Sequence, residues 1–384
     1  MKTLPNIETV VTPALLVDAP KLVSNISRMA ARAETADVEL WPHTKTHKTV
    51  QIARLQTEHG AAGLTVATLR EARCFADAGF ERILIAYPPV GDWRLDELLE
   101  LAEQIEVRVV LDGVDTVELL DHACGRRGNS LTYLWEVDCG VGRCGTQPGA
   151  PTAAQVAIAH ERFRHAVFGG LMTFGGHAYL AANTDEIRAA AENERDALGQ
   201  TAEAIEQLGI EVKARSAGTT PTSHQLVDRG PITEIRPGNY AFYDATQVTL
   251  GVAPVEHCAV SVLATVVARP DPRRLILDCG SKALAAERLS PRSTTFGLIP
   301  GHPQLNVERL FEEHAIVTAS EPVDTPLGTR LQVIPNHSCA TANLHSRMLV
   351  VEDGEVVDIW SVDARGWDIA AEKAATDAPY LRSA

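Results

Sequence analysis

Short apolar stretches alternate with amphipathic stretches over the first 250 residues of the chain. The apolar stretches are rich in β-branched residues, which is typical of strands buried on both faces of a parallel sheet. This pattern predicts eight strands, at Ala14–Asp18, Val38–His43, Gly63–Thr68, Arg82–Tyr87, Val107–Asp112, Thr132–Asp138, Val167–Thr173 and Val212–Ala217. The stretches between them have helical periodicity, as in Pro20–Ala33, Leu69–Ala78, Leu95–Gln104 and Asp185–Leu208.

Eight strand–helix units in about 230 residues have the size of a (β/α)8 barrel, so the predicted fold class is α/β with a TIM-like barrel. An open, doubly wound sheet is the alternative, but the first strand is not followed by a strong GxGxxG fingerprint. Beyond about residue 250 the pattern changes to strands with tight turns, and the Asp-Gly pair within Glu352–Glu355 is typical of a hairpin. We therefore predict a barrel over residues 12–250 and an all-β domain over residues 251–384, which residues 1–11 could join.

Composition and charge narrow the possible partners. Hydrophobic residues make up 45% and charged residues 22% of the 384 residues, which is ordinary for a globular protein. The net charge of −15 repels nucleic acid and anionic lipid, so we expect neither as a partner. We expect no signal peptide, because the amino terminus has no apolar stretch bounded by a cleavage site, and no membrane span, because nowhere do about 18 apolar residues run uninterrupted. The seven scattered cysteines form no CxxC pair and indicate reduced thiols in a cytoplasmic protein.

Candidate chemistry begins where the second predicted strand ends, in the stretch WPHTKTHK from Trp41 to Lys48. One interpretation is a solvated basic turn. The other follows from the barrel, whose active site lies where the strands end. A lysine at such an end can be desolvated, have a lowered pKa and act as a Schiff-base nucleophile.

Two later stretches, Ser216–Thr222 and Arg236–Tyr240, are rich in glycine, hydroxyl and amide groups. Such loops can be ordinary turns, but their backbone N–H groups can also bind a phosphate, which barrels often hold near the last strands. A Schiff-base lysine together with a phosphate site indicates pyridoxal 5′-phosphate as the cofactor.

Arg143 follows two glycines in the stretch Asp138–Gly145. It is either an arginine on a surface turn or the partner of the phenolate oxygen of the cofactor.

A possible metal site lies in the stretch Pro335–Asn343 of the predicted β domain. If this stretch is a strand, His337 and Cys339 lie on the same face, because side chains alternate with period two. Such a pair could bind zinc and leave positions open for water or substrate, or it could be an ordinary pair of buried residues.

With these motifs, the sequence resembles the fold-type III pyridoxal-phosphate enzymes related to D-threonine aldolase and eukaryotic-type D-serine dehydratase. The resemblance implies that Lys45, and not Lys48, forms the Schiff base, and that Arg143 binds the phenolate. It also implies further cofactor contacts by Ser216, Gly218, Thr219, Arg236, Gly238, Asn239 and Tyr240, and by His177 and Tyr179. In the dehydratase branch a histidine and a cysteine bind zinc, which here would be His337 and Cys339. The aldolases place an aspartate two residues after that histidine, so Cys339 favours a dehydratase.

The resemblance therefore implies a pyridoxal-phosphate- and metal-dependent lyase that acts on small D-3-hydroxy amino acids. A dehydratase of the D-serine or D-threonine type would yield a 2-oxo acid and ammonia. An aldolase, which would yield glycine and an aldehyde, stays the nearest alternative, and a racemase or a non-catalytic cofactor carrier is more remote. A thiolate ligand favours zinc, whereas harder ligands suit manganese or magnesium. The family also implies a homodimer.

Overall fold

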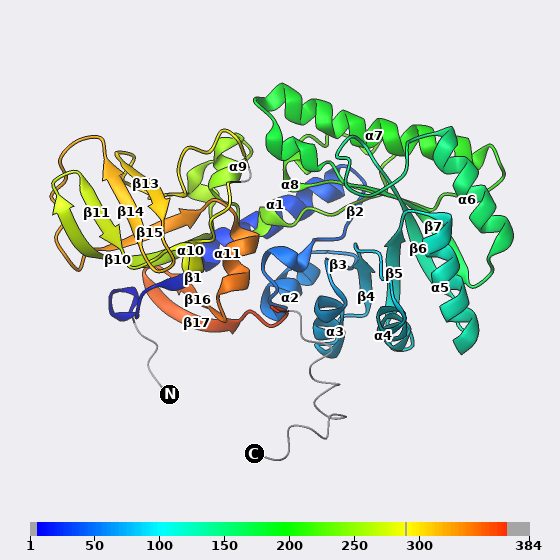
Figure 1. Ribbon diagram of the computed structural model, residues 1–384, viewed down its shortest axis with the longest axis horizontal. Coiled ribbons are helices and arrows are strands. Elements are labelled where there is room, and N and C mark those ends of the chain that lie inside the picture. The colour runs from blue at the N-terminus through cyan, green and yellow to red at the C-terminus, as the bar shows by residue number, and fades with distance from the viewer. Residues whose placement is uncertain (1–5, 289, 367–384) are drawn as a thin grey trace, which may run out of the picture.

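A computed structural model describes residues 6–288 and 290–366 of the chain. It has two parts, a barrel of parallel strands and a mostly antiparallel β domain, which lie side by side in Figure 1. This arrangement confirms the predicted fold class. The predicted β domain also included residues 367–384, which lie outside the described residues. The predicted domain boundary at residue 250 stays a prediction.

Eight parallel strands form the barrel. In spatial order they are β2 (Glu39–Leu40), β9 (Glu234–Ile235), β8 (Ala214–Ala217), β7 (Ala166–Thr173), β6 (Leu131–Val137), β5 (Glu106–Leu111), β4 (Arg82–Ile85) and β3 (Leu64–Val66). A bridge between His43 and Thr65 joins the two ends of this sheet. The barrel therefore closes just beyond the short strand β2.

Between Ala19 and Thr249 the chain forms the α-helices α1 (Ala19–Thr35), α2 (Val50–Glu58), α3 (Leu69–Asp77), α4 (Asp92–Ala102), α5 (Val114–Arg127), α6 (Ala150–Arg162), α7 (Thr184–Glu206), α8 (Thr220–Ser223) and α9 (Ala245–Thr249). Helices α2 to α7 surround the barrel, whereas α9 lies beside the β domain (Figure 1). Among the described residues, none of the helices is long and apolar enough to cross a membrane.

The first predicted strand was assigned to the wrong sheet. Its bounds match β1 (Ala14–Asp18), but β1 pairs antiparallel with β10 (Val260–Asp271) and parallel with β16 (Arg347–Glu352), both in the β domain. The eighth barrel strand is instead β9, which is only two residues long and gave no apolar pattern. A short strand buried on both faces has the same apolar pattern in either sheet, so periodicity could not separate the two possibilities.

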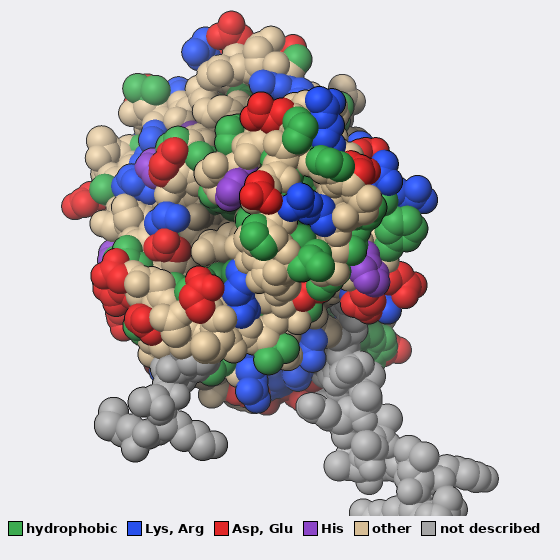
Figure 2. Space-filling model, turned by 90° about the vertical axis from the view of Figure 1, so that its left-hand side faces the viewer, with side chains coloured by type: hydrophobic (Ala, Val, Ile, Leu, Met, Phe, Trp, Pro, Cys, Tyr) green, Lys and Arg blue, Asp and Glu red, His purple; other side chains and the backbone are tan. Residues whose placement is uncertain are grey.

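The β domain is built on the order β13-β14-β11-β10-β1-β16-β17, and β15 pairs with β10 and β12. The remaining elements are β11 (Arg274–Leu277), β12 (Gly297–Leu298), β13 (Leu305–Leu310), β14 (Ala315–Ala319), β15 (Arg330–Pro335), β17 (Glu355–Ser361) and the short helices α10 (Ser281–Leu284) and α11 (Ser338–Leu344). The predicted Asp-Gly hairpin joins β16 to β17. On the face seen in Figure 2, acidic and basic side chains are interspersed with apolar ones.

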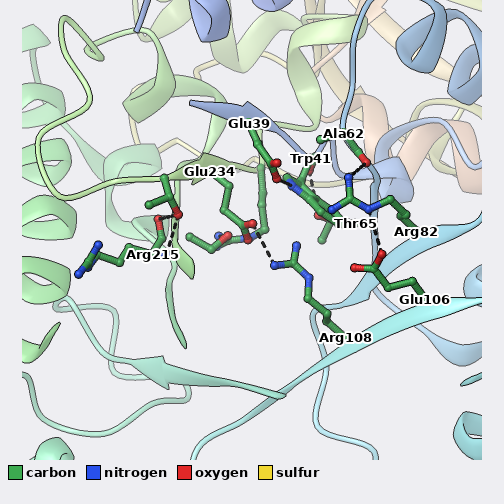
Figure 3. A network of polar contacts seen from close by, with 12 residues as sticks. Glu39, Trp41, Ala62, Thr65, Arg82, Glu106, Arg108, Arg215 and Glu234 are labelled. Atoms are coloured by element: carbon green, nitrogen blue, oxygen red, sulfur yellow. Dashed lines mark hydrogen bonds and ion pairs between the residues drawn. The ribbon is translucent and has the colours of Figure 1, made fainter. Parts of the chain in front are cut away.

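A polar network fills the barrel interior at the amino-terminal ends of the strands. Arg108 and Glu234 point toward one another in Figure 3, with 3.0 Å between Nη1 and Oε2. The Arg108 guanidinium lies 3.9 Å from the centroid of the buried Trp41 ring. Trp41 in turn packs with apolar side chains that point inward from the neighbouring strands. The Trp41 layer therefore separates two cavities, one at the amino-terminal ends of the strands, which Arg108 and Glu234 line, and one at the carboxyl ends, where barrels hold their active sites.

Candidate active site

A cavity of about 1400 Å³ lies at the carboxyl ends of the barrel strands and reaches the β domain. Most of the site residues predicted from the sequence line it, from six separate segments of the chain. These residues are Lys45, Arg143, Tyr179, Gly218, Thr219, Arg236, Gly238, Asn239, His337 and Cys339. The other three, His177, Ser216 and Tyr240, are not among the lining residues.

Lys45 lies on a single 3₁₀ turn, η2 (Thr44–Thr46), which follows β2. Its Nζ lies 5.6 Å from the centroid of the Phe174 ring. Burial lowers the pKa of Lys45, and the nearby Arg143 and Arg236 lower it further, whereas Cys339 opposes the shift. A neutral amine, which is the nucleophilic form, is therefore easier to reach at Lys45 than at an exposed lysine.

Lys48 has a different environment. Its Nζ lies 3.3 Å from Oε1 of the buried Glu71, whose other oxygen accepts the N–H of Ala67 at 2.8 Å. Lys48 is therefore held in an ion pair beside helix α3.

Arg143 reaches the cavity because Asp138 shapes the loop before it. Oδ1 of Asp138 accepts the N–H groups of Gly140 at 2.9 Å, Val141 at 2.8 Å and Gly142 at 3.1 Å. Gly140 and Gly142 have φ values of 120° and 70°, which favour glycine. The Arg143 guanidinium then lies 4.5 Å from the centroid of Phe174 and 3.6 Å from Oε1 of Glu136.

Two glycines let the backbone approach the cavity closely. A Cβ at Gly218 would lie 2.7 Å from Oγ of Ser223, and one at Gly238 would lie 2.8 Å from Oγ1 of Thr46. Gly218 also has a φ of 97°, which favours glycine. The two loops therefore present backbone and hydroxyl groups, rather than bulky side chains, to this part of the cavity.

A buried carboxylate fixes one of these loops from behind. Glu194 of α7 is only 2% exposed, and its Oε1 accepts the N–H of Gly218 at 3.1 Å and the N–H of Gly175 at 2.7 Å. It thereby ties together the segments that follow β7 and β8. Burial raises the pKa of Glu194, and these N–H groups oppose the shift.

The three predicted residues outside the lining have other environments. Ser216 accepts a hydrogen bond from Nη1 of Arg236, which is 5% exposed and also donates from Nη2 to the carbonyl oxygen of Thr173. The hydroxyl of Tyr240 accepts from Nε2 of Gln56 at 3.0 Å within the core. Ser216 therefore orients a residue of the cavity, and Tyr240 packs behind it.

His177 and Tyr179 lie on the 3₁₀ segment η3 (Gly176–Leu180). The ring nitrogens of His177 are buried without a hydrogen-bond partner among the described residues, and burial lowers the pKa of His177. Burial strongly raises the pKa of Tyr179, so its hydroxyl keeps its proton.

The predicted metal pair does not lie on a strand. His337 is the N-cap of α11 and Cys339 lies in its first turn, so the prediction of a strand was wrong at this point. Both side chains nevertheless line the cavity. Nδ1 of His337 contacts the carboxylate of Glu287, and Sγ of Cys339 lies 3.3 Å from Oγ1 of Thr46.

Burial disfavours the charged form of both His337 and Cys339. The attraction between the two charged forms is larger, so the net shift of each pKa favours the ion pair. His337 lowers the pKa of the Cys339 thiol, and Cys339 and Glu287 raise the pKa of His337. A thiol that ionises easily is a good ligand for a soft metal ion. Among residues 6–288 and 290–366, no group of three or more His, Cys, Asp or Glu side chains is placed to bind a metal. A metal on this pair would thus have open positions, as catalytic sites do.

Sequence reasoning missed several residues of the site. Glu136 and Phe174 lie in or beside predicted strands, and a charged residue inside an apolar strand is a signal that could have identified Glu136. Glu287 and the buried Asp244 lie in loops, where no periodicity marks them, and Glu194 lies on a helix with many acidic residues.

Family models match both parts of the chain. The model described as "Alanine racemase, N-terminal domain" matches residues 17–246, and "Putative serine dehydratase domain" matches residues 259–351. The first match alone covers more than half of the chain.

Three characterised relatives match over almost the whole chain. The D-threonine aldolase of Arthrobacter sp. is 32% identical over 360 residues, which are 93% of this chain and 93% of the relative. The D-threo-3-hydroxyaspartate dehydratase of Delftia sp. (strain HT23) is 33% identical and covers 91% and 96%. The D-serine dehydratase of Dictyostelium discoideum is 29% identical and covers 90% and 95%.

Solved structures give the same result. The D-threonine aldolase from Filomicrobium marinum superposes with a TM-score of 0.87, at 30% identity over 95% of this chain and 98% of that chain. A cysteine-to-alanine mutant of D-threo-3-hydroxyaspartate dehydratase "in the metal-free form" has a TM-score of 0.88, at 29% identity over 94% and 100%. By its sequence, its domains and its fold, the chain belongs to the fold-type III pyridoxal-phosphate lyases that include the D-threonine aldolases and D-serine dehydratases.

Proposed function

We propose that this protein is a pyridoxal-phosphate- and zinc-dependent dehydratase of D-3-hydroxy amino acids that forms a 2-oxo acid and ammonia. The observation that carries the proposal is that Lys45 and the pair His337–Cys339 face one cavity, close enough for Cys339 to influence the pKa of Lys45. A carbonyl cofactor and a metal could thus act on neighbouring atoms of one substrate.

The described residues fit the cofactor. Lys45 would hold it covalently, Arg143 would contact the ring oxygen, and the backbone of Gly218, Gly238 and Asn239 would receive the phosphate. Both glycines line the cavity, and a Cβ at either would collide with Ser223 or Thr46, so the two loops keep this shape only without a side chain there. Pyridoxal phosphate, when bound, withdraws electrons from the substrate Cα and makes a bond at that carbon labile.

Lys45 would then act as the base for the α-proton. The same desolvation that lowers its pKa favours the neutral amine, which is the form that can accept a proton. Glu136 would orient Arg143 from 3.6 Å, and the ring of Phe174 would exclude water from the space between Lys45 and Arg143.

His337 and Cys339 fit zinc, with a soft thiolate and an imidazole as ligands. Glu287 on Nδ1 of His337 would keep Nε2 available to the metal, as carboxylates behind metal-bound histidines often do. Zinc at this pair supplies a Lewis acid for the β-hydroxyl of the substrate, which helps that group to leave.

Aldol cleavage to glycine and an aldehyde is the second candidate, because the aldolase relative is as similar as the dehydratase. Both reactions would use a metal at the same hydroxyl. Cys339, where the aldolases of the family have an aspartate, favours the dehydratase. We also propose a homodimer, as the family implies, and a cytoplasmic location, which the scattered cysteines without a CxxC pair favour.

The test is a substrate panel in which all four products are measured separately. The protein is incubated with D-serine, D-threonine and D-threo-3-hydroxyaspartate, and the 2-oxo acid, ammonia, glycine and aldehyde are quantified. Equal amounts of 2-oxo acid and ammonia support the dehydratase. Glycine and aldehyde in equal amounts would instead identify an aldolase.

A further inference from the structure

One buried carboxylate joins the loop proposed for the cofactor phosphate to the loop proposed for the metal. Asp244 is 0% exposed, and its Oδ2 accepts the N–H of Ser338 at 2.9 Å and Nδ2 of Asn239 at 2.5 Å. Asn239 follows Gly238 at the cavity, and Ser338 lies between His337 and Cys339. The two proposed binding loops therefore share one acceptor atom.

Further hydrogen bonds hold the two loops together, and we call these contacts of Asp244, Asn239 and Ser338 the junction. Nδ2 of Asn239 also donates to Oγ of Ser338 at 2.9 Å, and Oγ1 of Thr246 donates to the carbonyl oxygen of Asn336 at 2.7 Å. Ser338, Thr246 and Asn336 are all at most 2% exposed, so water does not compete for these bonds. A displacement of either loop would leave buried polar groups unpaired, which is unfavourable because no water replaces the lost bonds.

We propose that Asp244 is a positioning residue that couples zinc binding at His337 and Cys339 to pyridoxal-phosphate binding at the loop of Gly238 and Asn239. This inference rests on the proposed function. If the cofactor orders the phosphate loop, Asp244 and Asn239 would hold Ser338 in place, and with it the flanking His337 and Cys339 that would bind zinc. Zinc therefore binds more tightly to the loaded protein than to the protein without cofactor.

The experiment measures zinc affinity of the full chain with and without pyridoxal phosphate, by competition with a chromophoric chelator. The coupling factor is the Kd for zinc without cofactor divided by the Kd with cofactor. We expect a factor above about five, at the lower end of measured couplings. By reciprocity, zinc tightens pyridoxal-phosphate binding by the same factor, which fluorescence titration with and without zinc measures.

Asp244→Asn separates coupling from simple loss of charge. The variant keeps the shape of the side chain and a good N-cap for α9, but its amide group faces the amide of Asn239. Loss of a negative charge alone weakens zinc binding equally in both states and leaves the coupling factor unchanged. Loss of the junction brings the factor to within about twofold of one, which is the result we expect.

The matched control is Asp121→Asn. Asp121 is also a buried carboxylate that accepts backbone N–H groups, from Arg164, His165 and Ala166, but it does not line the cavity. This variant keeps the coupling factor of the wild type. If Asp244→Asn does not fold, Ser338→Ala removes one bond of the junction and lowers the factor by a smaller amount.

A wild-type factor of one, or a wild-type factor retained in Asp244→Asn, overturns the inference while the proposed function stands. A protein that binds neither pyridoxal phosphate nor zinc overturns both.

Discussion

Lys45 and Lys48 are three residues apart, yet the fold gives them different chemistry. Both line the cavity, but Lys48 pairs with the buried Glu71, whereas Lys45 lies beside Phe174 and has a lowered pKa. The motif alone is compatible with a solvated basic turn and with a Schiff-base lysine. The difference arises from contacts with α3 and with the segment after β7, which are distant in the sequence.

We expect Lys45→Ala to lose turnover by at least roughly 10²- to 10⁴-fold, because nucleophile and base are removed together. Its melting temperature should stay near that of the wild type, since the side chain forms no ion pair with a described residue. In the wild type, borohydride should fix the cofactor to the peptide that contains Lys45. Label on Lys48 or Lys282, as found by peptide mapping, would contradict the assignment.

Cys339→Asp should change the metal preference. A carboxylate is a harder ligand than a thiolate, so affinity for zinc should fall relative to affinity for manganese. Competition between the two ions, measured by elemental analysis after dialysis, checks this. Cys339→Ala is the control, because it should lose both metals. An unchanged zinc-to-manganese ratio in Cys339→Asp would show that the thiol is not a ligand.

His47 gives the protein a stability term that depends on pH. Burial lowers its pKa to about 4, and its Nδ1 accepts the N–H of Thr49 at 3.1 Å. Between pH 6.5 and 4 the unfolded chain therefore binds a proton that the native state does not, and stability falls as the pH falls. The full shift corresponds to about 3 kcal/mol.

We expect His47→Gln to be less stable than the wild type at pH 7.5 but to lose less stability on acidification. Urea unfolding at pH 7.5 and pH 5 measures both free energies. If the free energy of unfolding falls by the same amount between pH 7.5 and pH 5 in both proteins, His47 does not contribute to the pH dependence of stability.

At the scale of elements, helix α7 (Thr184–Glu206) reaches the site through one residue. Its Glu194 accepts N–H groups from the segments that follow β7 and β8. In Glu194→Gln the amide oxygen can still accept both N–H groups, but hydrogen bonds to a neutral amide are weaker than hydrogen bonds to a carboxylate. We expect the affinity for pyridoxal phosphate to fall by roughly tenfold, equivalent to about 1.4 kcal/mol, because the loop with Gly218 loosens.

The matched control is Glu192→Gln, on an exposed position of the same helix. It should keep the wild-type affinity in an equilibrium titration of the cofactor. An equal loss in both variants would mean that the effect comes from the charge of the helix rather than from the loops.

The sequence predicts a helix or strand well where its hydrophobic pattern repeats over many residues. It predicts poorly those elements that are only two or three residues long. The long strands β5, β6 and β7 and helix α7 were predicted to within a few residues, because their apolar patterns are extended. The two-residue strand β9 and the turn into α11 carry too little pattern to be recognised.

Some residues of the candidate site could likewise be predicted from the sequence, and others could not. Residues that come directly after a strand, such as Lys45 and Gly218, could be predicted because a barrel gathers strand ends at one face. Asp244 and Glu287 could not, because their positions depend on how the two domains pack and not on local sequence.

At the scale of the whole molecule, the barrel segment is not independent of the β domain. Leu15 and Val17 of β1 are buried in a sheet whose other members come from beyond residue 259. We expect a fragment of residues 1–250 to be insoluble or unfolded, since β1 would expose its apolar residues and both of its unpaired edges. Circular dichroism of the fragment checks this.

Co-expression of fragments 1–250 and 251–384 should restore a soluble complex, because β1 can then pair with β10 and β16. A fragment 1–250 that folds cooperatively by itself would show that β1 is dispensable to the barrel.

The position of β1 also sets an order of events during synthesis. Val17 leaves the ribosome early, but its partner Val260 follows about 240 residues later, which is roughly 12–50 s at ordinary elongation rates. Val351, which pairs with Asp18 on the other side, comes later still. The strands of the barrel can pair with one another before β10 and β16, the partners of β1, have been synthesised. The first strand to be made is thus among the last to be paired, and for that interval the nascent chain carries an exposed apolar segment that a chaperone could bind.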